Sequence, residues 1–202
     1  MRIVLFLLTA FLACGSQAFE LWTSKGSIAT VNNNSEGWKA TYSAVVPDIT
    51  PAATATDIVV IKGSASKTIR INYIQVTADA TNPSVIDFYV YKRSAPDTGG
   101  TSSAVTTIAH DSADSAATAV VLSYSANPSA LGSGVLIRAN HYALPAAAST
   151  GYPGAPWSEE FGKRNDKTVV LHGANEMLAI GLNGQTIPAG TALYVTVEWT
   201  EE

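Results

Sequence analysis

The chain has 202 residues, of which 47% are apolar and only 14% are charged, and its formal net charge at pH 7 is −4. A chain of this length fits one domain with short appendages and is long enough to bury a core. The mild negative charge provides no basic surface for neutralising phosphates, which argues against a nucleic-acid partner. Ala, Val, Ser, Thr, Asn and Gly dominate, and they suit strands and turns better than long helices.

Residues 1–18 have the pattern of a secretory signal peptide. Arg2 precedes an apolar run over residues 3–13, and the small residues Ser16 and Ala18 follow it. This pattern predicts cleavage after Ala18. The run is too short to cross a bilayer of roughly 30 Å as a helix. Two alternatives stay open: a lipoprotein signal with Cys14 as the lipidated residue, and a retained N-terminal anchor.

Residues 19–38 are expected to form an irregular N-terminal arm ahead of a domain over residues 39–202. The arm carries Trp22, Trp38 and a run of three asparagines between them. Cys14 is the only cysteine of the chain, and it lies in the leader. The chain without its leader would therefore hold no disulfide and no thiol nucleophile.

From residue 39 onward, short strand patterns alternate with turns and loops. Each pattern is an apolar run or a polar–apolar alternation bounded by turn-forming residues. The expected strands are residues 40–46, 57–62, 68–77, 85–91, 118–125, 135–144, 168–171, 177–182 and 192–200, with a further short strand at 105–108. Long loops are expected over residues 47–56, on both sides of 105–108, and over 145–166.

Two of these segments carry more specific expectations. Ile58 to Ile61 form an apolar run between Asp57 and Gly63, which predicts a strand that is buried on both faces. Within residues 68–77, the apolar positions change phase near Asn72. Because one extra residue reverses the side-chain faces, this change predicts a β-bulge.

Residues 85–91 form the clearest strand in the sequence. Alternation places Asp87, Tyr89 and Tyr91 on one face, opposite a fully apolar face. A face with two tyrosines would be exposed to solvent or covered by another subunit. Residues 192–200 alternate in the same way, with Trp199 on the apolar face.

These elements favour an all-β fold: an antiparallel β-sandwich, jelly-roll-like, with long Ser/Gly/Pro-rich loops and a short N-terminal arm. No window longer than about ten residues keeps the 3.6-residue period of a helix. The chain has no internal repeat of fixed length, which disfavours propellers and solenoids.

No group of residues has the spacing of a catalytic or metal site. His110, His141 and His172 are about thirty residues apart and lack the short local spacing of zinc ligands. Gly132-Ser133-Gly134 lacks the spacing of a nucleophile elbow and is better explained as a turn before the strand at Val135. We therefore expect no catalytic residue, no metal and no cofactor, so that the protein is not an enzyme.

Paired charges are expected to be solvated. Glu159-Glu160 and Glu201-Glu202 are adjacent in sequence, and alternate side chains of an extended chain point apart, unlike the paired carboxylates of a glycosidase. Basic pairs such as Lys92-Arg93 are expected on solvated rims. A secreted hydrolase that uses His141 or Glu160 is the weakest of the functions considered.

Aromatic residues outside the core are the remaining functional signal. Such residues often mark contacts between subunits or with a sugar ring. The candidates for a contact surface are Trp22, Trp38, Tyr89, Tyr91, Tyr152 and Trp157. The alternative, for those in the arm and loops, is that they cap the open ends of the sandwich.

Several short motifs of turns and strands carry a resemblance to a known group of proteins. They are Ala55-Thr56-Asp57-Ile58, Gly63-Ser64-Ala65-Ser66-Lys67-Thr68, Lys92-Arg93-Ser94, Phe161-Gly162-Lys163-Arg164-Asn165-Asp166, Leu171-His172-Gly173, Leu182-Asn183-Gly184 and Glu198-Trp199-Thr200-Glu201-Glu202. Over about four-fifths of its length, from Ala40 to the C-terminus, the chain resembles small β-sandwich proteins encoded among the structural genes of tailed bacteriophages. These are virion-associated proteins of the head-decoration or fibre type. The resemblance implies a structural virion component that forms homo-oligomers such as trimers.

Two functions remain. The first is a structural assembly protein of the virion, whose partners are further copies of itself and other virion or cell-surface proteins. The alternative is an exported carbohydrate-binding or adhesion module, secreted or on the cell surface, with glycans as ligands. The secretory leader favours the alternative, because virions of tailed phages assemble in the cytoplasm.

Overall fold

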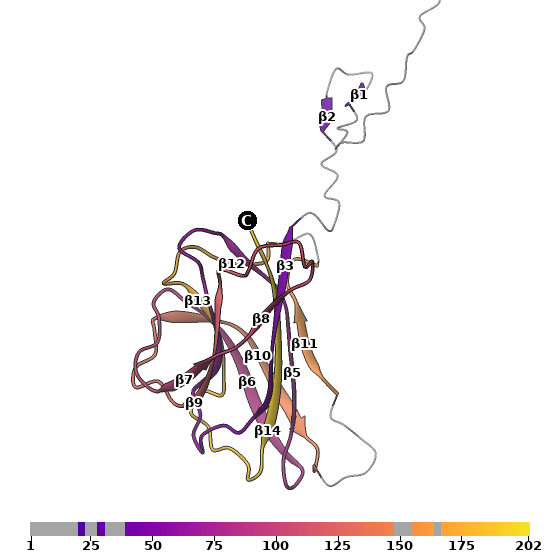
Figure 1. Ribbon diagram of the computed structural model, residues 1–202. Helices are drawn as coiled ribbons and strands as arrows, with labels where there is room; N and C mark the ends of the chain where they lie inside the picture. The colour runs from indigo at the N-terminus through magenta and orange to yellow at the C-terminus, as the bar shows by residue number, and fades with distance from the viewer. Residues whose placement is uncertain (1–19, 23–27, 31–38, 148–154, 164–166) are drawn as a thin grey trace, which may run out of the picture. The chain divides into compact units, whose positions relative to one another are not determined.

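A computed structural model of the chain describes residues 20–22, 28–30, 39–147, 155–163 and 167–202 (Figure 1). The leader, with Cys14, lies outside the described residues. In the described part of the chain, no helix has the length and apolar character needed to cross a membrane. The chain divides into two units, residues 1–38 and 39–202. In the first unit, β1 (Glu20–Trp22) pairs antiparallel with β2 (Ile28–Thr30).

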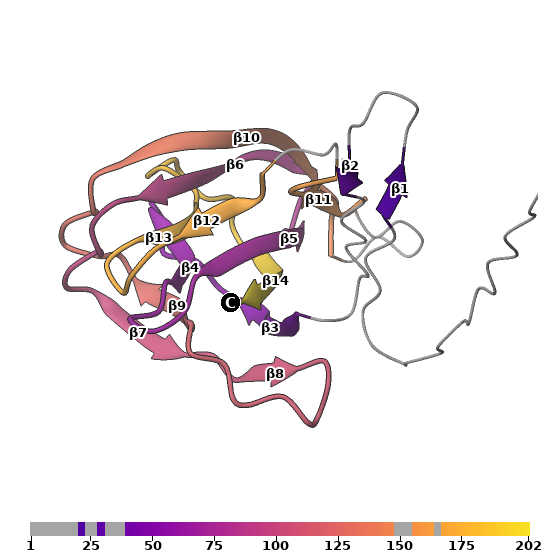
Figure 2. The same ribbon diagram turned by 90° about the horizontal axis from the view of Figure 1, so that it is seen from above.

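The second unit is a sandwich of two antiparallel sheets, and the expected all-β sandwich is confirmed (Figures 1 and 2). One sheet has the strand order β10-β6-β13-β4-β9-β7. The other has the order β11-β5-β14-β3-β8, with β12 also paired to β5. The strands are β3 (Ala40–Ile49), β4 (Asp57–Lys62), β5 (Ile69–Asp79), β6 (Ser84–Arg93), β7 (Thr101–Ala104), β8 (Thr107–Ala109), β9 (Val120–Ala126), β10 (Gly134–Leu144), β11 (Trp157–Glu160), β12 (Val169–Leu171), β13 (Met177–Gly181) and β14 (Ala192–Glu201).

The pairing of the main strands is nested. β3 pairs with β14, β4 with β13, β5 with β11 and β12, and β6 with β10. The first strand of the sandwich therefore pairs with its last strand. Each following pair joins two strands that lie between the strands of the preceding pair in the sequence. β7, β8 and β9 are inserted between β6 and β10, where β7 and β9 extend one sheet and β8 extends the other.

The core lies between the two sheets and has the side chains that alternation predicts. Along β14, Leu193, Val195, Val197 and Trp199 are almost fully buried. The apolar face of β6, from Ile86 to Val90, is buried in the same core. The alternation predicted for residues 85–91 and 192–200 is thereby confirmed.

Both specific expectations for the first half of the sandwich are confirmed. Ile58 to Ile61 are fully buried, and Val60 belongs to a second apolar cluster on the face of β4 away from the core. In β5, the pairing with β14 shifts at Asn72, so that Ile71 and Ile74 are both buried in the core. The bulge keeps both apolar ends of a long strand on one side of the sheet.

Two loop predictions are wrong in part. The strand expected at residues 105–108 is replaced by β7 and β8, which belong to different sheets. The loop expected at 145–166 contains β11, which begins at Trp157. Trp157 is 8% exposed and stacks on Phe88 of the core, with ring centroids 5.8 Å apart. The four residues of β11 hold one apolar side chain, so no alternation revealed the strand.

Candidate functional site

The outer face of β6 carries a row of polar and aromatic side chains. Asp87, Tyr89, Tyr91 and Arg93 project from it, because the alternate residues fill the core. The rings of Tyr89 and Tyr91 are near-parallel, with centroids 6.3 Å apart, and the guanidinium carbon of Arg93 lies 4.9 Å from the Tyr91 centroid. We call Tyr89, Tyr91 and Arg93 the tyrosine ladder.

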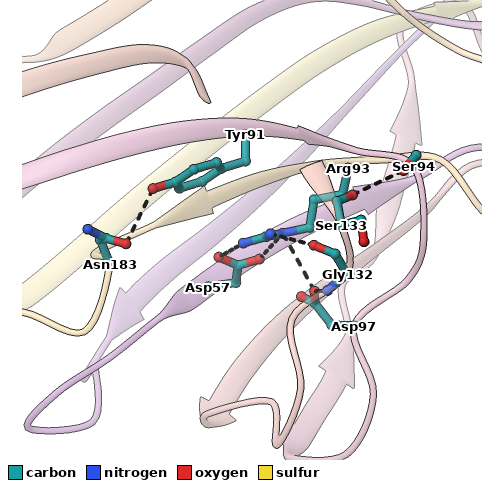
Figure 3. Close-up of polar contacts among 8 residues, drawn as sticks. All are labelled: Asp57, Tyr91, Arg93, Ser94, Asp97, Gly132, Ser133 and Asn183. Carbon is teal, nitrogen blue, oxygen red and sulfur yellow. Dashed lines mark hydrogen bonds and ion pairs between the residues drawn. The ribbon is translucent and has the colours of Figure 1, made fainter. Parts of the chain in front are cut away.

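Polar neighbours hold the hydroxyl groups of the ladder. Tyr91 Oη donates to Asn183 Oδ1 at 3.3 Å (Figure 3), and Tyr89 Oη donates to Asp87 Oδ2 at 3.4 Å. His141 Nδ1 lies 2.6 Å from Asp87 Oδ1 on the exposed side of this group. Burial and the negative charge of Asp87 raise the pKa of the Tyr89 phenol, which therefore stays protonated and available as a donor near neutral pH.

Arg93 also makes a buried, bidentate ion pair with Asp57. Its Nε donates to Asp57 Oδ2 at 2.7 Å and its Nη2 to Oδ1 at 2.8 Å (Figure 3). The two side chains are only 6% and 2% exposed. Asp57 begins β4 and Arg93 ends β6, with β13 between them in the sheet. Gly181 of β13 provides the space for the Asp57 carboxylate, because a Cβ at this position would lie 2.8 Å from Asp57 Oδ1.

A second carboxylate, Asp97, completes this cluster. Its Oδ1 lies 3.5 Å from Arg93 Nε and accepts the N–H of Gly132 at 2.8 Å. Its side chain is 0% exposed, and its Oδ2 has no hydrogen-bond partner among the described residues. Burial, with a further contribution from Asp57, raises the pKa of Asp97 to about 6, although the Gly132 N–H and Arg93 act in the opposite direction.

The Asp57–Arg93–Asp97 cluster ties two loops to the sheet. Arg93 Nη1 donates to the carbonyl oxygen of Gly132 at 2.8 Å, and Ser94 N donates to that of Ser133 at 2.8 Å. Loop 94–100 and loop 127–134 are thereby joined to each other and to β4. Gly132 fits because it has no side chain, since a Cβ there would lie 1.8 Å from the carbonyl oxygen of Ala95.

The expectation that Lys92-Arg93 is a solvated pair is wrong for Arg93. Adjacent residues of a strand point to opposite faces, so the two basic groups enter different surroundings. Lys92 stays half-exposed and pairs with Glu176 at 3.2 Å, whereas Arg93 is buried.

The expectation of a solvated carboxylate is also wrong for Glu201, which is buried in β14. Its carboxylate accepts hydrogen bonds from Thr118 N, Thr118 Oγ1, Ala119 N and Trp199 Nε1, at 2.6–3.0 Å. Burial by itself raises the pKa of Glu201, but these four donors outweigh it and leave the pKa lowered. Glu202 is exposed and pairs with Lys39 and Arg70.

The three histidines lie apart from one another in the described structure. Across the described residues, no group of three or more His, Cys, Asp or Glu side chains could hold a metal ion. His110 and His172 are exposed, and His141 contacts Asp87 alone of the acidic residues. Ser133 stands in the turn directly before β10, as expected.

The aromatic candidates have different outcomes. Tyr89 and Tyr91 lie on the outer face of their strand, as predicted. Trp157 is a core residue of β11, so its predicted place in a loop outside the core is wrong. Trp22 lies in β1, and Trp38 and Tyr152 lie outside the described residues.

The outer face of the second sheet holds exposed apolar side chains. Val45, Ile108 and Tyr194 are 53%, 61% and 44% exposed. In the strand register Val45 is opposite Thr196 and Ser43 is opposite Ile108, so Ile108 and Tyr194 are diagonal neighbours of Val45. We call these three residues the open face.

Sequence reasoning missed the Asp57–Arg93–Asp97 cluster. One signal was present: Asp57 stands directly before the apolar run Ile58 to Ile61, where a charged side chain needs a partner. Comparison of the chain with protein family models, with curated proteins and with solved structures found no match.

Proposed function

We propose that this protein is a structural assembly component of the virion-associated type, which works through contacts with further copies of itself. The open face carries this proposal. Ile108 and Tyr194 are exposed diagonal neighbours of the exposed Val45 on a sheet surface, and exposed apolar patches can serve as interaction sites.

The nested strand pairing supports a jelly-roll topology. With β11 and β12 taken as one interrupted strand, four strands have the order β3-β14-β5-β11/12 and four have the order β4-β13-β6-β10. The eight strands thus form four antiparallel pairs in series, and these pairs are shared between the two sheets. Jelly rolls are used as viral capsid domains, lectin domains and cupins. This topology agrees with the proposed role without selecting it among these classes.

A second copy of the chain is the partner that we propose for the open face. The whole chain has a formal charge of −4, so two copies repel each other weakly wherever acidic groups meet. The open face itself is neutral, with Glu198 and Asp79 beside it on β14 and β5. Interface centres are enriched in aromatic residues, and Tyr194 supplies one such side chain to this face.

A carbohydrate-binding role has less support. Stacking on a sugar needs an aromatic ring with a free face. Trp157 is buried, and Tyr91 is flanked by Tyr89 and Arg93 along the ladder. Trp157 and Tyr91 therefore offer a poorer platform for a sugar than the sequence suggested.

Light scattering coupled to size-exclusion chromatography tests the assembly proposal. The full chain is expected to elute as a symmetric oligomer, and Val45→Glu is expected to reduce it to monomers. In a symmetric interface the same face meets itself, so the new carboxylates lie close together, and like charges in contact cost several kcal/mol.

Val85→Glu is the matched control. Val85 is 47% exposed, similar to Val45, but it lies in β6 of the other sheet. It should leave the oligomer intact. A wild-type chain that is monomeric at all micromolar concentrations would refute the proposal, and equal dissociation by both variants would refute the open face as the interface.

A further inference from the structure

We infer that Asp97 holds a proton beside the buried Asp57–Arg93 ion pair, and that this proton locks loops 94–100 and 127–134 onto the sheet in acid and releases them toward neutral pH. The Asp57–Arg93–Asp97 cluster is therefore a pH-sensitive lock. This lock does not depend on the proposed assembly role.

The number of charges and donors is the first argument. Two carboxylates share one guanidinium, and Asp57 takes both the Nε and the Nη2 of Arg93 at 2.7 and 2.8 Å. The Nη1 group is used by the Gly132 carbonyl oxygen at 2.8 Å. Asp97 is left with one N–H donor and a contact of 3.5 Å to Arg93.

The second argument is burial. With both carboxylates ionised, the cluster would carry a net charge of −1 in a place where the three side chains are 6%, 2% and 0% exposed. A buried charge without a full set of partners is strongly unfavourable, and binding a proton removes it. Oδ2 of Asp97, which has no hydrogen-bond partner in the described part of the chain, is the atom that the proton would occupy.

The other groups around the cluster do not supply the missing charge. Tyr91 of β6 and Tyr124 of β9 face it, and burial, aided by the negative charge of Asp97, raises the pKa of the Tyr124 phenol. The Tyr124 phenol is thus neutral in the relevant range. On the same side of the sheet, β13 presents Met177, Ala179 and Gly181, which carry no charge.

The direction of the pH effect follows from the proton affinity. The pKa of Asp97 is raised from its ordinary 3.8 to about 6, so the folded state binds this proton more tightly than the unfolded chain does. The resulting stability is fully present below about pH 4 and is lost as the pH rises through about 6. This is the opposite of the usual behaviour of an aspartate in an ion pair.

The lock acts on an apolar sheet edge. Loop 127–134 carries the exposed Leu131 and leads directly into Val135 and Leu136, which are exposed at the start of β10. β10 is the outermost strand of its sheet in the described part of the chain. Releasing the loop would therefore change how this edge is presented to other molecules.

Carboxyl ¹³C NMR and amide hydrogen exchange on the full chain test the lock. The Asp97 carboxyl is expected to titrate near pH 6. The amides of Thr98 and Ala130, which bond across the two loops, should lose at least tenfold in protection between pH 5 and pH 7.5, after correction for intrinsic exchange.

Asp97→Asn is the informative variant, because the amide keeps an acceptor for Gly132 and has no charge. In this variant, the amides of both loops should be equally protected from hydrogen exchange at pH 5 and pH 7.5. Asp111→Asn, in an exposed loop, should behave like the wild type. An Asp97 carboxyl that titrates near pH 4, or unchanged loop protection in the wild type, would overturn the inference even if the variant did not fold.

Discussion

Glu201 and Asp97 are both buried carboxylates, yet their surroundings move their proton affinities in opposite directions. Glu201 has four hydrogen-bond donors, two of them backbone N–H groups. Asp97 has one, and it lies beside a second carboxylate. The pKa of Glu201 is lowered, whereas the pKa of Asp97 is raised. Burial alone therefore does not decide the charge of a carboxylate: the number of hydrogen-bond donors and the charges nearby also contribute.

The two sites differ in what surrounds them. Glu201 is on a central strand and receives donors from Thr118 and Ala119, which precede another strand, and from Trp199 on its own strand. Asp97 is on a loop, and its donor is the backbone of a second loop. We expect the first site to be rigid at all pH values near neutral and the second to respond to pH.

Removing the cation from the Asp57–Arg93–Asp97 cluster should have the largest effect. Arg93→Met leaves two buried carboxylates without their partner, and breaking a buried pair in this way costs about 3–5 kcal/mol of unfolding free energy. The loss should be smaller at pH 5 than at pH 7.5, since Asp97 is then protonated. Urea denaturation at the two pH values measures it.

Lys92→Met is the neighbouring control. Lys92 is half-exposed in its pair with Glu176, and such pairs contribute about 0–1 kcal/mol. If Arg93→Met and Lys92→Met cost the same, the contrast between buried and exposed cations in this strand is wrong.

Glu201→Gln should have an intermediate effect. The amide presents an NH₂ group where four donors converge, so one or two of them lose their acceptor, at about 1–3 kcal/mol. The lowered pKa of Glu201 means that its contribution is present above the ordinary value of 4.5 and is lost as the pH falls through the folded pKa. Thermal unfolding between pH 3 and 7 should show a shallower acid slope in the variant, and an unchanged slope would contradict this account.

Glu160→Gln should have the smallest effect. Glu160 pairs with Lys163 at 2.6 Å, but the side chains are 48% and 67% exposed. Solvent screens such a pair, so we expect a change below about 0.5 kcal/mol. The same urea titration measures it, and a loss comparable to that of Glu201→Gln would show that exposure is a poor guide to the energetics of carboxylates here.

The regular strands were predictable because their side chains report which face is buried. Trp199 and Phe88 lie in the core because apolar residues alternate around them over several positions, and Asn72 revealed a bulge by breaking that alternation. β11 was missed because a single apolar residue, Trp157, shows no period.

The candidate site was predictable only in part, for a different reason. Alternation placed Tyr89 and Tyr91 on the outer face, since that is a local property of one strand. Asp57 and Arg93 are 36 residues apart, and their burial depends on two loops that no local pattern places above the sheet. Glu201 resembles any terminal acid in sequence, because three of its four donors come from residues 82 and 83 positions away.

The nested strand order also determines how the sandwich responds to mechanical force. Ala40 at the start of β3 lies opposite Glu201 at the end of β14, so both ends of the sandwich domain leave it from the same side. A pull on these two ends opens the β3–β14 pair like a zipper, one hydrogen bond at a time, instead of shearing all the bonds together. The domain should therefore unfold at low force when held by its termini, and a load-bearing attachment would have to grip it elsewhere.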